Sequence, residues 1–365
     1  MDYYQLRYDF RDQAERARVI GNLQRLRKAL DEKIPSKDQS DSLLLATWNV
    51  RDLGKDFLLG LDKDYDKRKL RRGAGPRQPE TFWYIAEIIS RFDFVAVQEV
   101  NEIDEWEKIW SILGRDWDFI ATEVTDPKLG GNGERLLFAF DKRKVTFRKI
   151  AGEVVLPPDM LITDAKKPGE KTKQFARTPF LTSFQAGWFK FDICTVHIFY
   201  GKERGDALKQ RIDEIDRIAA FLAKYAKQAF RKTQTLFLLG DFNIISPQHD
   251  TMKALIQHGF RSPGSAYFKT NVSHTMHYDQ IAYLSRGSGI DVKGQTDLPE
   301  ADYGTFAFFD HVYTDDQETE YARQMQQSNK SKYKDWRTYQ MSDHQPLWVR
   351  LKVNDSEAYL EKLKG

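Results

Sequence analysis

The feature that most constrains the fold is a series of short apolar runs between residues 43 and 353. Each run is seven to nine residues long, and polar segments separate it from the next, which is typical of buried strands. The runs are 43–50, 92–100, 135–141, 180–186, 191–199, 235–243, 278–284 and 345–353. Segments with helical spacing lie between some of them, at 81–92, 205–229 and 249–260. Because strands and helices do not alternate strictly, we predict an α+β protein of stacked mixed sheets flanked by helices, rather than a barrel or a Rossmann sheet.

The segment before the first strand has a different periodicity. Its apolar residues recur at three- and four-residue steps and predict one amphipathic helix over 10–34, which Pro35 ends. Such a terminal stripe more often packs on its own domain, although it could instead bind a partner or mediate self-association. No repeat or low-complexity linker divides residues 41–355. We therefore divide the chain into an N-terminal helical extension (1–40), one large domain (41–355) and a C-terminal tail (356–365).

Composition excludes several classes of protein. With 41% hydrophobic and 13% aromatic residues, the 365-residue chain can build a large core and is not mainly disordered. No apolar stretch approaches the ~20 residues of a membrane span, and the polar start MDYYQLRYDFRDQ is unlike a signal peptide, so we expect a cytoplasmic protein. The single cysteine, Cys194, excludes an internal disulfide and a cysteine-based zinc site. Its apolar neighbours predict a buried, unreactive side chain.

Polar residues with the chemistry of an active site stand where several of the runs end. They are Asn49, Glu99, His197, Asp241 and Asn243, and Asp343 and His344 stand just before the last run. One polar residue at a strand end is usually a turn former, but this many together indicate a site. Carboxylate and amide oxygens suit magnesium or manganese. His274 and His277 form a His-x-x-His pair, but without acids at suitable spacing we interpret it as structural.

Six short motifs within these runs occur in an order that is far more specific than any one of them. The motifs are TWN (47–49), QE (98–99), TVH (195–197), GDFN (240–243), YDQI (278–281) and SDH (342–344). Together they resemble the endonuclease/exonuclease/phosphatase superfamily over residues 43–353. The resemblance implies a four-layer αββα sandwich with its site at one end of the two sheets. It also implies hydrolysis of a phosphoester with Mg²⁺ or Mn²⁺, without identifying the substrate.

The resemblance also implies a metal-binding role for three residues. Glu99 would be the principal ligand of the ion, and Asn49 would contribute directly or through water. Asp343 would bind the ion or support its water shell. A divalent ion on a phosphate oxygen offsets the charge that develops when water attacks.

Five residues would carry the proton transfer and the charge stabilisation. By the resemblance, His344 acts as the base and Asp279 of the YDQI motif orients it, while Asp241 is a competing candidate for the base. Asn243 would orient the nucleophile, and His197 would donate a hydrogen bond to the phosphate oxygen.

A second acidic residue competes with Asp279 as the partner of His344. Asp310 lies in FDHVY (309–313), which also resembles the family's acid-bearing strand. We prefer Asp279 because IAY continues a clean strand after it. The segment around Asp310 fits an aromatic core strand capped by a turn equally well.

Arginines and basic loops are the expected substrate contacts. Arg135 and Arg177 occur in contexts that resemble the family's phosphate-contacting segments, and a guanidinium fork suits phosphate. Residues 63–78 hold seven basic and two acidic side chains although the whole chain carries only +3. Within this segment we expect substrate contacts from Lys67, Arg68, Arg71 and Arg72.

Two further segments carry smaller basic excesses, 164–177 and 323–337. We expect both to border the same cleft, although for any one loop solvated charge is an equally good interpretation. Tyr65, Tyr333 and Trp336 interleave with basic residues and could stack on bases.

Three functions remain open on this sequence. The first is a metal-dependent nuclease that hydrolyses DNA or RNA through a metal-activated water. The second is a phosphatase of a phosphorylated small molecule or headgroup. The third is a catalytically silent scaffold that binds partners through its N-terminal helix, and the full motif set argues against it.

Overall fold

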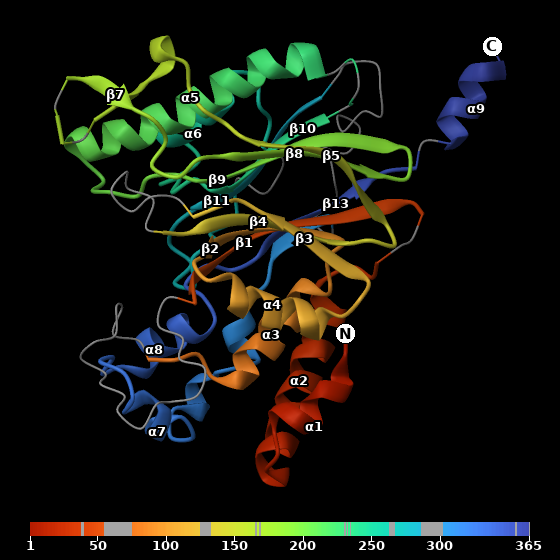
Figure 1. Cartoon of the computed structure of the whole chain (residues 1–365), viewed down its shortest axis with the longest axis vertical. Coiled ribbons are helices and arrows are strands. Elements are labelled where there is room, and N and C mark those ends of the chain that lie inside the picture. Colours follow the sequence, from red (N-terminus) through yellow and green to blue (C-terminus); the bar gives the residue numbers. More distant parts are fainter. Residues whose placement is uncertain are drawn as a thin grey trace.

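Two stacked β-sheets form the centre of the structure, and helices cover the outer face of each (Figure 1). The computed structural model describes residues 1–37, 40–54, 75–124, 133–164, 166–167, 169–229, 231, 233, 235–262, 267–285, 302–354 and 356–364. The predicted four-layer α+β sandwich is confirmed. Each of the eight predicted runs contains a strand.

One sheet has six strands and the other has five. The six-stranded order is β12 (Tyr303–Thr305), β13 (Leu347–Lys352), β1 (Ser42–Leu53), β2 (Phe94–Val100), β4 (Arg135–Asp141) and β3 (Trp117–Ala121). The five-stranded order is β11 (Asp279–Ser285), β10 (Thr235–Asp241), β9 (Phe189–His197), β8 (Phe180–Ala186) and β5 (Val145–Glu153). A separate pair joins β6 (Ile162–Thr163) and β7 (Lys171–Lys173). Both large sheets are mixed, because β1–β2 and β9–β10 are parallel whereas their neighbours are antiparallel.

Helices of unequal length form the outer layers. The six-stranded sheet is covered by α2 (Gln13–Lys33), α3 (Pro79–Ile89) and α4 (Ile103–Leu113), with the short α1 (Leu6–Asp9) beside them. The five-stranded sheet is covered by α5 (Gly205–Ala229) and α6 (Asp250–Ile256). A smaller helical region near the C-terminal end of the chain holds η8 (Phe308–Asp310), η9 (Asp315–Gln317), α7 (Ala322–Met325) and α8 (Tyr333–Gln340).

Both faces of the central strands are buried, which explains why their sequences are continuously apolar. In β1, Leu43 and Leu45 point into the core between the sheets, whereas Leu44, Ala46 and Trp48 point toward the helices. This alternation is the two-residue period of a strand with apolar surroundings on each side.

Phenylalanines fill the layer between the sheets. The rings of Phe94 and Phe184 meet edge to face at 4.8 Å, and Phe138 and Phe191 pack around them. Cys194 faces the opposite layer, under α5, and is buried as predicted. Burial raises the pKa of its thiol, consistent with an unreactive side chain.

The N-terminal helix packs against the rest of the chain. Helix α2 begins after Asp12, whose carboxylate accepts a hydrogen bond from the Glu15 amide at 2.8 Å. Its apolar stripe, including Leu23 and Leu26, belongs to the same core cluster as Trp83 of α3. The domain boundaries given above remain predictions.

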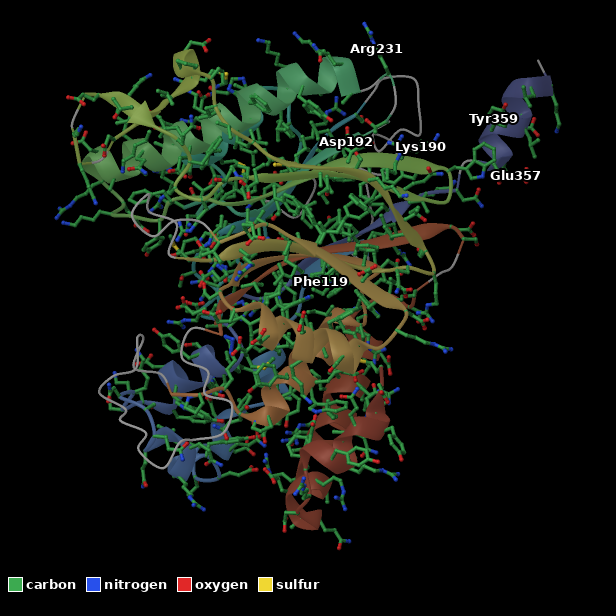
Figure 2. The ribbon with its side chains drawn as sticks, in the orientation of Figure 1. Phe119, Lys190, Asp192, Arg231, Glu357 and Tyr359 are labelled. Carbon is green, nitrogen blue, oxygen red and sulfur yellow. The ribbon has the colours of Figure 1, made fainter. Side chains whose placement is uncertain are left out.

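The last helix lies away from the two sheets. Helix α9 (Ser356–Lys364) carries Glu357 and Tyr359 beyond the end of the body (Figure 2). The Tyr359 ring meets Trp188, in the turn between β8 and β9, at 5.5 Å. Within the described ranges, no helix is both long enough and apolar enough to cross a membrane.

Candidate active site

Strand register brings three of the expected residues to one level of the five-stranded sheet. Asp241, the last residue of β10, pairs with His197 at the end of β9 and with Asp279 at the start of β11. In the facing sheet, the parallel strands β1 and β2 carry Asn49 and Glu99 to the corresponding edge. The side chains meet there because the carboxyl ends of parallel strands share one edge.

The first group of potential ligands joins Asp241, Asp279 and His344, all buried. His344 Nδ1 lies 2.8 Å from Asp279 Oδ2 in a hydrogen bond, and its Nε2 lies 3.7 Å from Asp241 Oδ2. Burial lowers the pKa of His344, but the charges of Asp279 and Asp241 raise it more, so the net pKa lies well above its usual value. The other oxygen of Asp279, Oδ1, has no hydrogen-bond partner among the described residues.

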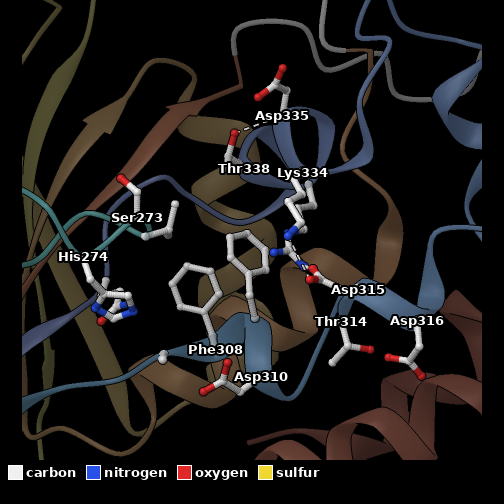
Figure 3. Close-up of a pocket in the computed structure, with 15 residues that line it drawn as sticks. Ser273, His274, Phe308, Asp310, Thr314, Asp315, Asp316, Lys334, Asp335 and Thr338 are labelled. Atoms are coloured by element: carbon white, nitrogen blue, oxygen red, sulfur yellow. Dashed lines mark hydrogen bonds and ion pairs between the residues drawn. The ribbon is translucent and has the colours of Figure 1, made fainter.

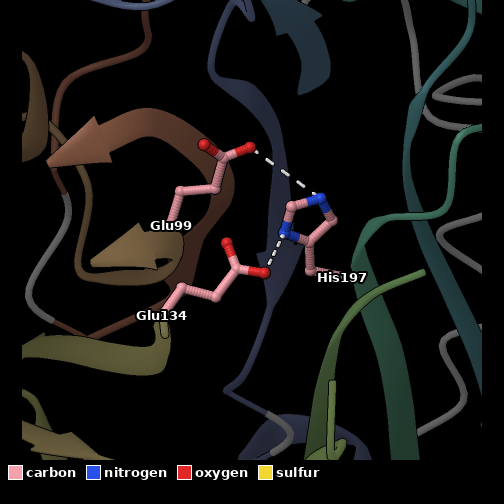
Figure 4. A group of neighbouring side chains, drawn as sticks. All are labelled: Glu99, Glu134 and His197. Carbon is pink, nitrogen blue, oxygen red and sulfur yellow. Dashed lines mark ion pairs between the residues drawn. The ribbon is translucent and has the colours of Figure 1, made fainter. Parts of the chain in front are cut away.

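The second group joins Glu99, Glu134 and His197 (Figure 4). His197 Nε2 lies 3.8 Å from Glu99 Oε1, and His197 Nδ1 lies 3.1 Å from Glu134 Oε1 without the geometry of a hydrogen bond. Burial, with the nearby charge of Arg177, lowers the pKa of His197 to about 4, so its ring is neutral near pH 7. Glu134 is absent from the sequence predictions. The only hint of it is that it directly precedes Arg135.

The Asn49 amide connects the two groups. Its Nδ2 donates to Glu99 Oε1 at 2.8 Å and to Asp241 Oδ2 at 3.1 Å. Glu99 also accepts a hydrogen bond at 2.8 Å from the Asp52 amide. Burial raises the pKa of Glu99, but the neighbouring His197 lowers it, and the Asn49 hydrogen bond, the charge of Arg177 and the Asp52 hydrogen bond lower it further, so the net pKa lies below its usual value.

The backbone is strained where these side chains converge. Glu99 and Asn243 have positive φ angles of 63° and 54°, and Arg51, two residues after Asn49, has a φ of 47°. Residues other than glycine rarely adopt this conformation, and such strain tends to gather at functional sites. The glycine of GDFN is required by space: a Cβ on Gly240 would lie 2.1 Å from the Val196 carbonyl oxygen.

Asn243 is held by three hydrogen bonds. Its amide N–H donates to Asp241 Oδ1 and its Nδ2 donates to the Ile198 carbonyl, both at 2.9 Å. Its own carbonyl accepts a hydrogen bond at 3.2 Å from the buried guanidinium of Arg211 on α5. The side chain therefore has a fixed orientation beside Asp241.

Asp343 lies apart from both groups. Its carboxylate is 3.2 Å from Arg51 Nη1 and its side chain is 43% exposed. Arg51 also donates to Thr338 Oγ1 of α8 and stacks on the Tyr339 ring at 3.7 Å. The contacts of Arg51 therefore connect Asp343 to α8.

The predicted arginine contacts differ in their surroundings. Arg177 is buried and donates to Glu134, so its guanidinium acts on the site through that carboxylate. Arg135 donates to the Asn101 carbonyl at 2.6 Å. The other four predicted substrate contacts, Lys67, Arg68, Arg71 and Arg72, lie outside the described residues, as does Tyr65.

The structure corrects the stacking hypothesis for two aromatic residues. Tyr333 and Trp336 are only 3% and 1% exposed, and their rings stack on each other 5.9 Å apart in the core beneath α8. They cannot receive a nucleobase. The two form the buried face of α8, because residues three apart lie on one side of a helix.

Asp310, the alternative partner of His344, is exposed and lies in η8. The hydrogen bond at 2.8 Å therefore pairs His344 with Asp279.

The basic segments are partly neutralised by ion pairs. Lys334 and Arg337 both contact Asp315, at 2.9 and 2.7 Å, and Lys173 contacts Asp164 at 3.1 Å. These cations are therefore less free to bind phosphate than their sequence suggests.

The donor set at the strand ends fits a divalent ion. Glu99, Glu134, Asp241 and Asp279 bring four buried or half-buried carboxylates together, and Asn49 adds an amide. Such a concentration of negative charge is costly unless cations or hydrogen bonds compensate it. Hard oxygen donors favour magnesium or manganese over zinc.

Comparison with known proteins gave one curated relative. No family model matches the chain. A deoxyribonuclease of Thioalkalivibrio sp. (strain K90mix) is 26% identical over 223 residues, which cover 60% of this chain and 50% of that protein. The chain thus spans about half the length of the curated relative it matches.

Solved structures with a similar course of the chain have low sequence identity. An endonuclease/exonuclease/phosphatase family protein from Bacteroides thetaiotaomicron is 16% identical, with a TM-score of 0.49 over 87% of this chain and 99% of that one. The human Nocturnin catalytic domain, with a bound sulfate anion, is 15% identical (TM-score 0.48; 86% and 95% covered). A mannosyl-6-phosphatase from Bacteroides thetaiotaomicron VPI-5482 is 16% identical (TM-score 0.49; 86% and 100% covered).

Proposed function

We propose that this chain, which resembles the endonuclease/exonuclease/phosphatase superfamily, is a divalent-metal-dependent phosphodiesterase that cleaves DNA or RNA. One observation carries the proposal: two groups of carboxylates and histidines, centred on Asp241 and Glu99, converge at one end of the stacked sheets. Acids, histidines and amides that meet in this way have the chemistry needed to activate water and to stabilise a phosphoester transition state.

Glu99 and Asn49 are the proposed holders of Mg²⁺ or Mn²⁺, and Asp343 would support the water shell. When bound, the ion would polarise the phosphate and stabilise the charge that develops on its oxygens. Glu99 is suited to this role because its carboxylate stays ionised although the residue is largely enclosed.

His344 is the proposed acceptor of the proton from the attacking water, and Asp279 would orient its ring. The hydrogen bond to Asp279 fixes Nδ1, which leaves Nε2 facing Asp241. Because its pKa is raised, His344 loses its proton and becomes able to accept another only at more alkaline pH. With this assignment the rate rises with pH.

Asp241 is the competing candidate for the base, and the two assignments predict opposite changes of the rate with pH. If Asp241 takes the proton while protonated His344 binds the phosphate, the rate falls as His344 loses its proton. The direction of the pH–rate profile therefore separates the two roles.

His197 and Asn243 complete the proposed mechanism. A neutral His197 can donate one N–H to a phosphate oxygen as negative charge builds there. The fixed amide of Asn243 would orient the attacking water beside Asp241.

Two observations support a nucleic acid as the substrate. The matched relative is a deoxyribonuclease, and residues 63–78 concentrate positive charge in a chain whose total is small. A phosphatase of a phosphorylated small molecule is the alternative outcome of the same test.

The test is a substrate panel with the purified chain. Labelled single- and double-stranded DNA, RNA and bis(4-nitrophenyl) phosphate are incubated with Mg²⁺, Mn²⁺ or EDTA, and release of inorganic phosphate from sugar phosphates is measured in parallel. We expect cleavage of a polynucleotide that EDTA abolishes. Release of phosphate from sugar phosphates without polynucleotide cleavage would replace the nuclease by the phosphatase, and no metal-dependent hydrolysis of any substrate would reject the proposal.

A further inference from the structure

Two tyrosine rings lead from the proposed catalytic histidine to the surface. The Tyr278 ring lies 5.5 Å from the His344 ring, and the Tyr200 ring lies 6.1 Å from the Tyr278 ring at an angle of 89°. His344 is buried, Tyr278 is half-buried and Tyr200 is 50% exposed. The mechanism proposed above uses His344 but neither tyrosine. Tyr200 is therefore an accessible aromatic ring on the side of the chain that carries His344.

Both tyrosines stand next to residues of the candidate site in the sequence. Tyr278 directly precedes Asp279, and its carbonyl accepts a hydrogen bond at 2.9 Å from the amide of Phe242 in the GDFN motif. Tyr200 follows His197 by three residues, just beyond the end of β9. The positions of both rings are therefore tied to the strand ends that form the site.

A buried guanidinium fixes the backbone at Tyr200. Arg211 of α5 donates from Nε to the Tyr200 carbonyl at 2.7 Å and from Nη2 to the Gly201 carbonyl at 3.1 Å. The same guanidinium donates to the Asn243 carbonyl, so it links Tyr200 to the site. Its Cζ also lies over the Tyr200 ring, 5.1 Å from the ring centre. Arg211 therefore covers one face of this ring, and a ligand would stack on the other face.

The turn after Tyr200 has little conformational freedom. Gly201 has a φ of 56°, which favours glycine, and a Cβ at this position would collide with the Phe199 ring. The Phe199 amide donates a hydrogen bond to Glu214 Oε2 of α5 at 3.0 Å. Because the backbone already holds the ring in place, little freedom is lost when a ligand binds, and more of the stacking energy contributes to affinity.

The cavity of about 820 Å³ between η8 and α8 is a less suitable place for a planar group next to the scissile phosphate (Figure 3). Phe308 in its lining is 1% exposed, and Arg337 covers the Phe309 ring at 4.4 Å. Gln345, which also lines this cavity, directly follows His344 in the chain. Residues 343–345 therefore separate the cavity from the His344 side chain.

We propose that Tyr200 is a stacking surface for a nucleobase that flanks the scissile phosphate. The inference rests on the proposed phosphodiesterase function and adds a contact that selects nucleotides over other phosphodiesters. The base would stack on the face of the ring that Arg211 does not cover, and Tyr278 would keep the base one ring away from His344. Stacking on an aromatic side chain typically strengthens binding by about 5- to 150-fold per base. Because every base has a flat face, this contact requires no particular sequence.

Substrates that differ only in the base test the proposal. We compare the 5′- and 3′-(4-nitrophenyl phosphates) of 2′-deoxyadenosine with those of 1,2-dideoxyribose, which has the same sugar and no base. At least one deoxyadenosine ester should have a kcat/KM about tenfold higher than its base-free counterpart, mainly through KM. The ester that gains identifies the side of the phosphate on which the base lies. Equal kcat/KM with and without the base, for both esters, would overturn the inference.

Variants of Tyr200 show whether this ring causes the base effect, which is the ratio of kcat/KM with the base to kcat/KM without it. Tyr200→Ala should reduce the ratio to less than about twofold, whereas Tyr200→Phe and Tyr200→Trp should retain it because each keeps an aromatic face. A general loss of structure would lower both kcat/KM values and leave the ratio unchanged. Tyr8→Ala, at a 61% exposed tyrosine of α1, is the matched control and should keep the ratio. An unchanged ratio in Tyr200→Ala would reject Tyr200 as the stacking surface.

A sugar is the other ring that could pack on Tyr200. Methyl glucoside 6-(4-nitrophenyl phosphate) is therefore compared with methyl 4-nitrophenyl phosphate, which has no sugar. If the glucoside ester gains an advantage that Tyr200→Ala removes, and the deoxyadenosine esters gain none, the ring binds a sugar and the nucleobase is rejected.

A binding measurement keeps the two proposals separable. Titration with 2′-deoxyadenosine 5′-phosphate and with 1,2-dideoxyribose 5-phosphate in EDTA requires no turnover. If no diester is hydrolysed with Mg²⁺ or Mn²⁺, but the nucleotide binds about tenfold more tightly than the base-free phosphate and Tyr200→Ala removes the difference, the phosphodiesterase proposal fails and the stacking surface stands. If diesters are hydrolysed but the base changes neither kcat/KM nor binding, the stacking surface alone is wrong.

Discussion

The pairing of His344 with Asp279 predicts the outcome of a double-mutant cycle. The two side chains meet at 2.8 Å in a site where Asp279 is fully buried, so little else can substitute for the carboxylate. Loss of a general base typically lowers a rate 10²- to 10⁴-fold, or about 2.7 to 5.4 kcal/mol at 1.36 kcal/mol per factor of ten. We expect His344→Ala to lower kcat by this amount. Asp279→Asn should do the same, because it keeps the shape and removes the charge.

The double variant distinguishes a pair from two independent groups. If Asp279 acts only through His344, Asp279→Asn should change kcat by less than about twofold in the His344→Ala background, so that the two losses do not add. Initial rates on methyl 4-nitrophenyl phosphate at saturating metal, with metal affinity measured for each variant, provide the assay. Asp159→Asn, at an exposed residue of the short 3₁₀ helix Pro158–Met160, controls for loss of a carboxylate.

Two results would refute this reasoning. A double variant whose loss equals the product of the single losses would mean that the residues act separately. If Asp310→Asn impaired activity as much as Asp279→Asn, Asp310 would again be a candidate partner of His344.

Three further predictions follow from the same geometry. Glu99→Gln should abolish metal-dependent turnover and weaken metal binding while the melting temperature stays within a few degrees. Glu102→Gln, at an exposed neighbouring residue, is the control, and full activity of Glu99→Gln with Mg²⁺ would reject the site. The charge of Asp279 raises the pKa of His344, so Asp279→Asn should lower the pKa of His344. If His344 is the base, the rising limb of the pH–rate profile should move to lower pH, whereas a shift of a falling limb would favour Asp241 as the base. Replacing Lys67, Arg68, Arg71 and Arg72 by Ser should reduce the slope of the log–log salt dependence of nucleic-acid binding by about three to four units. If binding by the unmodified chain is already insensitive to salt, the result would argue for the phosphatase.

Eight of the strands were predictable because both of their faces are buried, whereas the largely exposed edge strand β5 was not predicted. A strand between two apolar layers has a continuous apolar sequence, so its polar end is conspicuous, as at Asn49, Glu99 and Asp241. These positions are therefore visible without any three-dimensional information. Helix α4 is harder to predict from the sequence, because only the spacing of its apolar residues marks its buried face, and that face includes the polar Glu105.

Glu134 was missed because nothing marks it in the sequence. It stands before a strand instead of after one, in a polar segment that precedes β4. Only the folded chain brings it to His197 and Arg177. The stacking hypothesis for Tyr333 and Trp336 was wrong for the opposite reason. Their basic neighbours suggested an exposed surface, but a spacing of three residues places both rings on the buried side of α8.

The sequence also could not predict the distance between the two halves of the site, because packing between the two sheets sets that distance. Register along hydrogen-bonded strands fixes His197, Asp241 and Asp279 relative to one another, but Asn49 and Glu99 belong to the facing sheet.

Several polar contacts join the two halves, including the His344–Asp279 and Arg177–Glu134 hydrogen bonds. Asn49 reaches Asp241 at 3.1 Å, and Gln98 donates to Thr195 at 2.9 Å just behind them. Stacked sheets lie about 10 Å apart, and phenylalanines such as Phe94 and Phe184 fill this layer. A buried aromatic residue remote from the phosphate therefore helps to set the distance between Glu99 and Asp241, on which metal binding and proton transfer would both depend.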